Sequence, residues 1–112
     1  MSSAFLRTDF FNGDLSKWDV SRVTDMSLMF SHAKVFDGDI SEWHVSSANN
    51  LAHMFFGATA FNSDISKWDM SSVNNMQGMF HDAITFNGDL TQWDVSSVTD
   101  MTSMFSLSLI HI

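Results

Sequence analysis

The feature that most constrains this chain is a ten-residue phrase that recurs every 25 positions. It reads FNGDLSKWDV from Phe11, FDGDISEWHV from Phe36, FNSDISKWDM from Phe61 and FNGDLTQWDV from Phe86. A catalytic site needs its special residues once, whereas a fixed period of roughly 20–50 residues is the signature of stacked structural repeats. The sequence therefore predicts an array in which each copy is one rung.

Six columns of the repeat hold one residue type in all four copies, represented in the first copy by Phe11, Asp14, Trp18, Ser21, Met29 and Phe30. One such unit cannot bury its own apolar face, so neighbouring copies must close the core between them. Equivalent aromatic side chains then form ladders, one of Trp18, Trp43, Trp68 and Trp93 and another of Phe30, Phe55, Phe80 and Phe105. We interpret both ladders as core rather than as a cofactor site or a strip that binds sugars.

The apolar spacing changes within each unit. Leu15, Trp18 and Val20 predict a short strand, with Trp18 and Val20 on one face. The spacing then becomes helical, along a stripe made of Val23, Met26, Met29, Phe30 and Ala33. Ser21 is placed to cap that helix, and Asn12-Gly13 predicts a left-handed turn before the strand. Each unit is therefore expected to contain a turn, a short strand, a bend, a short helix and a loop.

Composition restricts the classes of function. The chain has 112 residues of which 45% are apolar, which indicates one modest folded domain rather than a disordered chain. Its formal net charge is −8 with five Lys and Arg residues in all, so we expect no nucleic-acid partner. There is no Cys, hence no disulfide, thiolate metal site or Cys nucleophile. No stretch approaches the roughly 20 apolar residues of a membrane span, so we expect no membrane contact by this fragment.

The repeat phrase resembles known families. The pattern L/I-x-x-W-x-V/M-x-x-V/A, which begins at Leu15, Ile40, Ile65 and Leu90, is similar to the core of leucine-rich repeats. The fuller phrase FNGDISxWDVSxVTxMxxMF resembles the BspA-type repeat of bacterial surface proteins and mycoplasma-type lipoproteins, from about Phe5 to Phe105. With the spacing above, it predicts a leucine-rich-repeat-like α/β solenoid with one short parallel strand and one short helix per 25-residue repeat. The resemblance also implies a cell-surface or extracellular location and a role in adhesion or other protein contacts.

The sequence departs from leucine-rich repeats at one position. The Asn that serves backbone groups at the strand exit is replaced by Val23, Ala48, Val73 and Val98. Another polar group must take those hydrogen bonds. The Asp14 and Ser21 columns are the candidates, because short oxygen-bearing side chains bond readily to nearby backbone.

The repeat boundaries divide the chain. Residues 1–106 are interpreted as a fragment of a solenoid array, with a partial unit at 1–10 and repeats that start at 11, 36, 61 and 86. The last six residues, LSLIHI at 107–112, match the translation of a common transposon-end sequencing adaptor, and we interpret them as not native. The alternative is a hydrophobic C-terminal capping strand.

Two groups of titratable residues suggest chemistry. The Asp14, Asp39, Asp64 and Asp89 column either binds calcium between rungs or accepts backbone amides from its own turns, and we favour the second interpretation. His44 falls between Asp19 and Asp69, which suggests a pH-tuned contact or a weak metal site, although a solvated surface histidine is the favoured interpretation. No nucleophile, base and orienting group come together in the sequence, so we predict no enzyme activity and no cofactor.

The outward strand positions give the candidate binding residues, which are Asp19, Ser21, Glu42, His44, Ser46, Lys67, Asp69, Ser71, Gln92, Asp94 and Ser96. Repeat arrays bind partners along such extended surfaces. The predicted function is a non-enzymatic protein-binding or adhesion module that contacts a protein ligand or a host or cell-surface component. The alternatives are residues that only keep the sheet hydrated, a structural spacer or rod that self-associates end to end, and, more distantly, a carbohydrate-binding solenoid, which requires exposed aromatic residues.

Overall fold

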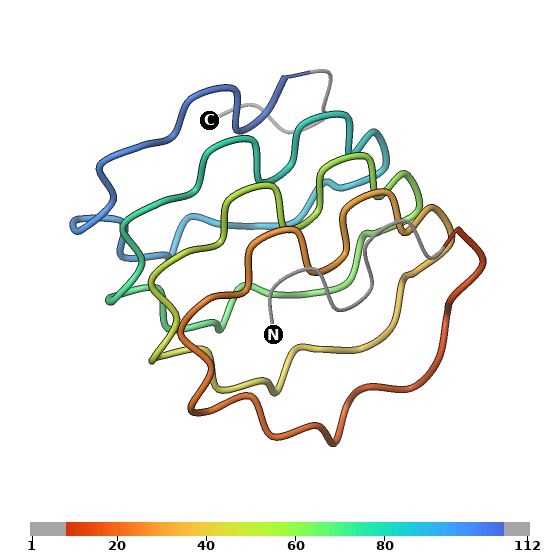
Figure 1. Ribbon diagram of the computed structural model, residues 1–112, viewed down its shortest axis with the longest axis horizontal. Helices are drawn as coiled ribbons and strands as arrows, with labels where there is room; N and C mark the ends of the chain where they lie inside the picture. Colours follow the sequence, from red (N-terminus) through yellow and green to blue (C-terminus); the bar gives the residue numbers. More distant parts are fainter. Residues whose placement is uncertain (1–8, 107–112) are drawn as a thin grey trace.

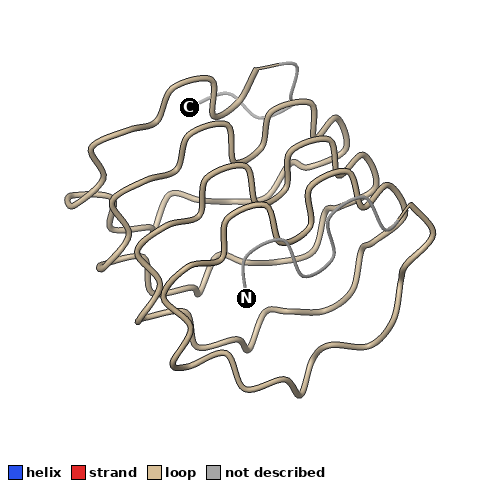
Figure 2. Ribbon diagram, viewed as in Figure 1, coloured by secondary structure: helices blue, strands red, loops and turns tan. Residues whose placement is uncertain are grey.

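The backbone of the computed structural model, which describes residues 9–106, consists of consecutive turns. Figure 2 shows this whole range as loop, and no helix or strand forms within it. Pairing of β type is limited, in these residues, to isolated parallel bridges of Asp25 with Asn50, Asn50 with Asn75, and Asn75 with Asp100. The predicted fold class, an α/β solenoid with a strand and a helix in each repeat, is therefore wrong. Residues 107–112, which we interpreted as adaptor-derived, lie outside the described residues.

Equivalent positions of successive repeats nevertheless lie next to each other. Each bridge joins residues 25 positions apart, and Asn12 accepts a hydrogen bond from the amide of Asp37 across the same interval. Figure 1 shows wave-like stretches at about 23–33, 48–58, 73–83 and 98–106 running side by side, from orange to blue. The chain is thus a stack of turn-rich rungs.

The stretch predicted as a helix, 23–33, directs its amide groups in two ways. The amide of Met26 donates to the carbonyl of Asn50 in the next repeat (2.9 Å), whereas the amide of Ala33 donates to the carbonyl of Phe30 in its own turn (3.0 Å). An α-helix requires each amide to bond four residues back within the same segment. Turns of three residues also point Met26, Met29 and Phe30 inward, so the apolar spacing imitates that of a helix.

Left-handed residues interrupt each of these stretches. Leu28 has a φ of 59° and His32 a φ of 58°. Two columns share this conformation, Leu28, His53, Gly78 and Ser103 in one and His32, Gly57 and Asp82 in the other. A left-handed residue is incompatible with a continuing right-handed helix. The left-handed turn predicted at Asn12-Gly13 is wrong, because Gly13 is not among the residues with positive φ. The glycine is needed there for space, since a Cβ would lie 2.8 Å from the Phe11 ring.

Turns also lie at both ends of the segment predicted as a strand. The amide of Trp18 donates to the carbonyl of Leu15 (3.1 Å), and the amide of Val23 donates to that of Val20 (3.0 Å). Neighbouring repeats are joined here by a side chain, since the indole N–H of Trp43 donates to the carbonyl of Leu15 (2.9 Å). The sequence predicted a parallel sheet at this position, and this side-chain hydrogen bond joins the repeats in its place.

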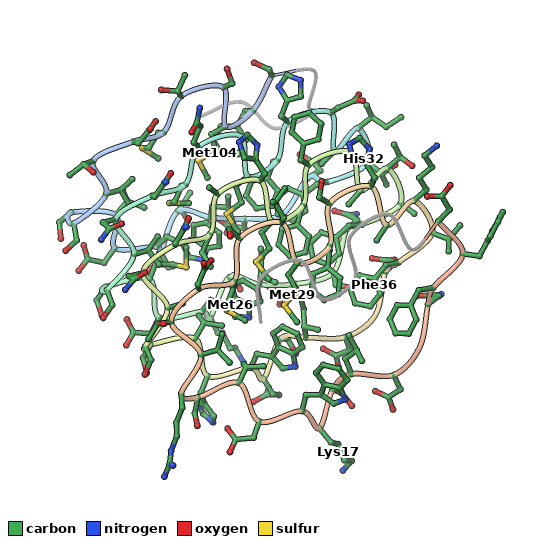
Figure 3. All side chains as sticks on the ribbon, in the orientation of Figure 1. Lys17, Met26, Met29, His32, Phe36 and Met104 are labelled. Atoms are coloured by element: carbon green, nitrogen blue, oxygen red, sulfur yellow. The ribbon has the colours of Figure 1, made fainter. Side chains whose placement is uncertain are left out.

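The core consists of aromatic ladders. The ladder of Phe30, Phe55, Phe80 and Phe105 is confirmed, with centroids of neighbouring rings 5.6, 5.6 and 5.7 Å apart and planes within 7° of parallel. A second ladder contains Phe11, Phe36, Phe61 and Phe86 and contacts the first, as between Phe55 and Phe61 at 4.1 Å. Met26 and Met29 are fully buried beside them, while Lys17 lies at the outer margin of the stack (Figure 3).

The tryptophan column belongs to this core in three of the four repeats. Trp43, Trp68 and Trp93 are 4%, 3% and 8% exposed, and the rings of Trp43 and Trp68 stack at 6.4 Å with planes 4° apart. The interpretation of these residues as core is confirmed. Trp18 differs, because 41% of its surface is exposed.

Candidate binding face

We use the name binding face for the eleven residues predicted to contact a partner. Ten of them are exposed and Ser21 is half-buried. Their sequence neighbours point the other way: in the second repeat Trp43 and Val45 are buried, while Glu42, His44 and Ser46 are exposed. The alternation that the sequence predicted for this segment therefore holds in the second and third repeats, although turns rather than a strand produce it, and it is broken in the first and fourth repeats by the exposed Trp18 and Val95.

Aspartate and serine pairs fix the polar groups of this face. One carboxylate oxygen of Asp19, Oδ1, accepts both the amide (3.0 Å) and the hydroxyl (2.6 Å) of Ser21. Asp69 and Ser71 repeat both bonds at the same distances. The predicted helix-capping role of Ser21 is wrong, because its hydroxyl donates to Asp19 and no helix follows.

These bonds keep the carboxylates ionised. The hydroxyl of Ser21, followed by its amide, lowers the pKa of Asp19, and the charges of Arg22 and His44 contribute less. The pKa of Asp69 is lowered in the same order by Ser71, against the opposing effects of desolvation and, after it, of the neighbouring Asp94 charge. The face thus presents fixed negative charges at the interval of the repeat, with His44 in the place of an aspartate in the second repeat.

The Asp14 column serves its own turns. Asp14 Oδ1 accepts the amide of Ser16 (2.9 Å), and Asp39 Oδ1 accepts the amide (3.0 Å) and the hydroxyl (2.7 Å) of Ser41. The favoured interpretation, that this column accepts backbone amides from its own turns, is confirmed, whereas the predicted role of the Asp14 and Ser21 columns at the strand exit is wrong, because Asp14 serves Ser16 and the Ser21 hydroxyl donates to Asp19. Among residues 9–106, no three His, Cys, Asp or Glu side chains converge on a position for a metal ion.

Sequence reasoning missed two further columns that bond to the backbone. The side-chain oxygen of Asn12 accepts the amide of Asp37 (3.0 Å), and that of Asp37 accepts the amide of Asn62 (2.8 Å). In the second column Asn50 accepts the amide of Ala52, two residues on (3.0 Å). Their signal was present in the sequence, because each column carries Asn or Asp in every copy: Asn12, Asp37, Asn62 and Asn87, and Asp25, Asn50, Asn75 and Asp100.

The structure also brings together histidines that share no motif. His32, His53 and His81 surround Phe56, with ring centroids 5.2, 5.5 and 4.7 Å from it. Two of these contacts are edge-to-face and the His81 ring is stacked on Phe56. Figure 3 shows His32 well away from Lys17 in this view.

Comparison with known proteins places the repeats in a family. The family model described as Mycoplasma protein of unknown function, DUF285, matches residues 1–109. The chain belongs to this family. The DUF285 match spans all four repeats and every residue of the binding face, and it confirms the predicted resemblance at the level of a mycoplasma repeat family. No curated protein and no solved structure matches the chain. No helix long and apolar enough to cross a membrane occurs in the described range.

Proposed function

We propose that this DUF285 chain is a non-enzymatic protein-binding or adhesion module of a surface-exposed repeat protein of the BspA type. Its binding face contacts a protein ligand or a host or cell-surface component. The observation that supports this most directly is the repeated Asp–Ser pair, which holds an ionised carboxylate at an exposed position in the first and third rungs. A carboxylate fixed before binding loses less conformational freedom when a partner arrives.

Binding by this face is additive along the stack. A single exposed ion pair contributes about 0–1 kcal/mol, so no one rung holds a partner alone. Several rungs that engage the same partner strengthen binding through effective concentration. The net charge of −8 favours a basic partner surface and makes the interaction weaken as salt concentration rises.

The alternative, carbohydrate binding by the tryptophan column, lacks an exposed aromatic ring in three of the four repeats. Stacking on a sugar requires an open ring face, and Trp43, Trp68 and Trp93 are buried against the phenylalanine ladders. The carboxylates are therefore the groups to test.

A charge-matched pair of triple variants tests the proposal. Asp19→Asn, Asp69→Asn and Asp94→Asn together neutralise three carboxylates of the binding face and keep an acceptor oxygen for each serine. The control is the triple change Asp14→Asn, Asp64→Asn and Asp89→Asn, which alters the net charge equally in the other aspartate column. Binding of each fluorescently labelled chain to cultured animal cells is measured by flow cytometry.

We expect the face variant to bind at least about tenfold more weakly than the control, from three contacts of roughly 0.5 kcal/mol each. Raising salt should weaken wild-type binding in the same experiment. Equal losses in the two triple variants would show that net charge rather than this face matters, and absence of wild-type binding would reject the adhesion role.

A further inference from the structure

Two Asn-Gly pairs occupy the same place in the repeat. They are Asn12-Gly13 and Asn87-Gly88, whereas the third repeat has Asn62-Ser63 at the equivalent positions. An asparagine followed by glycine carries an electrophile, its side-chain amide carbon, next to a backbone nitrogen that no Cβ shields. Each pair therefore contains both partners of a cyclisation reaction. We use the name Asn12 column for Asn12, Asp37, Asn62 and Asn87.

The exposure of this column is a property of the repeat. All four side chains are exposed, including those of Asp37 and Asn62 in the inner repeats. The open surface at Asn12 and Asn87 therefore does not result from their places in the first and last described repeats. Water, which opens the ring that such a cyclisation forms, reaches the column in every repeat.

The backbone nitrogen that follows the column is not engaged. Within residues 9–106 the amides of Gly13 and Gly88 donate to no acceptor, and those of Gly38 and Ser63 in the inner repeats do not either. A nitrogen that already donates a hydrogen bond must lose that bond before it reacts. The two glycine nitrogens are therefore available without the loss of a hydrogen bond.

The junction to the next repeat activates the asparagine. Oδ1 of Asn12 accepts the amide of Asp37 at 3.0 Å. A donor fixed at this oxygen stabilises the negative charge that develops there when a nucleophile adds to the carbon. Nδ2 of Asn12, the leaving group, donates to no acceptor in the described part of the chain. Departure of this nitrogen therefore breaks no contact of the stack.

The third repeat supplies an internal comparison. Oδ1 of Asn62 accepts the amide of Asn87 at 2.8 Å, so this asparagine has the same junction bond as Asn12. The next residue differs, because Ser63 has a Cβ beside its nitrogen. Its hydroxyl also donates to the backbone carbonyl and to Oδ1 of Asp37 (2.9 and 3.0 Å), which holds the residue in place. Asn62 should therefore be less reactive than Asn12.

We propose that Asn12 and Asn87 are sites of spontaneous modification, at which the chain converts its own asparagines to acidic residues. The nitrogen of the following glycine loses its proton and bonds to Cγ. The bond from Cγ to Nδ2 breaks, and ammonia leaves with that proton, so that a five-membered succinimide remains. Water then opens the succinimide at one of its two carbonyl carbons, which gives aspartate or isoaspartate. This modification is independent of the binding face and of its partner.

The stack accepts the aspartate product. Asp37 already belongs to the Asn12 column, and its carboxylate accepts the amide of Asn62 at 2.8 Å. An aspartate formed from Asn12 can hold the amide of Asp37 in the same way. Isoaspartate instead adds a methylene to the main chain and displaces the acceptor. Each conversion adds one negative charge, so reaction at both sites changes the net charge from −8 to −10.

Ageing of the full chain at mildly alkaline pH and body temperature tests the proposal. Peptide mapping by mass spectrometry measures, at each asparagine, the mass increase caused by replacement of an amide with a carboxyl group. Conversion at Asn12 and Asn87 should be about tenfold faster than at Asn62, which corresponds to a difference in activation free energy of about 1.4 kcal/mol. Ion-exchange chromatography should show two successive acidic species over the same period.

Two kinds of variant identify the cause. Ser63→Gly gives the third repeat the glycine of the first and fourth repeats, and it should raise the rate at Asn62 to that at Asn12. The double change Asn12→Gln and Asn87→Gln should abolish both acidic species, because the longer side chain must close a six-membered ring. Asn62→Gln is the matched control and should age as the wild type does. Near-ultraviolet circular dichroism reports whether each variant keeps its tryptophan core.

Three results would overturn the inference. The first is equal rates at Asn62 and at the two Asn-Gly sites of the wild type. The second is an unchanged rate at Asn62 in folded Ser63→Gly. The third is a wild type that reacts only after unfolding in urea, since the fold would then protect both sites. Where Ser63→Gly loses the tryptophan signal, the comparison of the three asparagines within the wild type decides the question.

Discussion

The indole N–H of Trp43 lies 2.9 Å from the carbonyl oxygen of Leu15, a residue of the preceding repeat. The bond recurs from Trp68 to Ile40 and from Trp93 to Ile65. It joins two rungs inside the core, where an unpaired N–H would be unfavourable. The tryptophan at this fixed position of the repeat thus links neighbouring repeats by a hydrogen bond and also fills the core.

Trp68→Phe should lower the free energy of unfolding by about 2 kcal/mol. About 1 kcal/mol comes from the lost hydrogen bond to Ile40, and the remainder from the cavity left by the smaller ring. Urea denaturation followed by circular dichroism measures the change. Trp18→Phe is the matched control and should have a clearly smaller effect, because Trp18 is 41% exposed. Equal effects at the two positions would show that the burial of Trp68 contributes nothing measurable.

Phe55→Ala should destabilise the chain by about 3–5 kcal/mol, the usual result of truncating a buried phenylalanine. The ring of Phe55 contacts those of Phe30 (5.6 Å), Phe61 (4.1 Å) and Phe80 (5.6 Å), so its removal interrupts both ladders. A loss of this size is comparable to the whole stability of many small domains. Thermal melting measures the loss. The control is Phe105→Ala, at the partly exposed end of the ladder, which should lower the melting temperature less.

The repeat, the ladders and the buried columns could be predicted from the sequence because identical residues at a fixed period must occupy equivalent environments. Phe30 and Phe55 are 25 residues apart and stack, as that argument requires. The exposed polar positions could be predicted because they alternate along the sequence with the buried Trp43 and Val45. These predictions depend on which residues share a column, and they hold whatever the backbone conformation.

The secondary structure could not be predicted in the same way. The spacing of Met26, Met29 and Phe30 fits a helix and a series of three-residue turns equally well. The choice between them depends on the amide of Met26, whose acceptor is the carbonyl of Asn50 in another repeat. Local sequence contains no signal of that partner. The cluster of histidines around Phe56 was missed for a related reason, since its members occupy different columns and meet only through the turns.

Gly57→Ala should destabilise the chain through two separable effects. The φ of Gly57 is 68°, a conformation that disfavours a side chain by about 1–2 kcal/mol. A Cβ there would also lie 2.7 Å from Nδ1 of His32, so the imidazole must move. In a His32→Ala background only the backbone effect remains, and the cost of Gly57→Ala should fall. Chemical denaturation of the wild type, the two single variants and the double variant gives the coupling energy between the two substitutions. If their effects on the free energy of unfolding were strictly additive, the predicted contact would be contradicted.

Stability should decline in acid, and Ser71 should control part of that decline. Nine aspartates, Asp14, Asp19, Asp25, Asp39, Asp64, Asp69, Asp89, Asp94 and Asp100, have a pKa lowered below the ordinary value of 3.8, chiefly by hydrogen bonds from a serine or threonine two residues on. A group whose pKa is lower in the folded state contributes stability above its ordinary value and loses it as pH falls through the lowered one. The melting temperature should therefore fall as pH decreases from about 4. Ser71→Ala removes the largest cause at Asp69, so the pKa of that carboxyl, followed by NMR, should rise toward its ordinary value. Ser72→Ala is the adjacent control, and an unchanged Asp69 titration in Ser71→Ala would contradict the assigned bond.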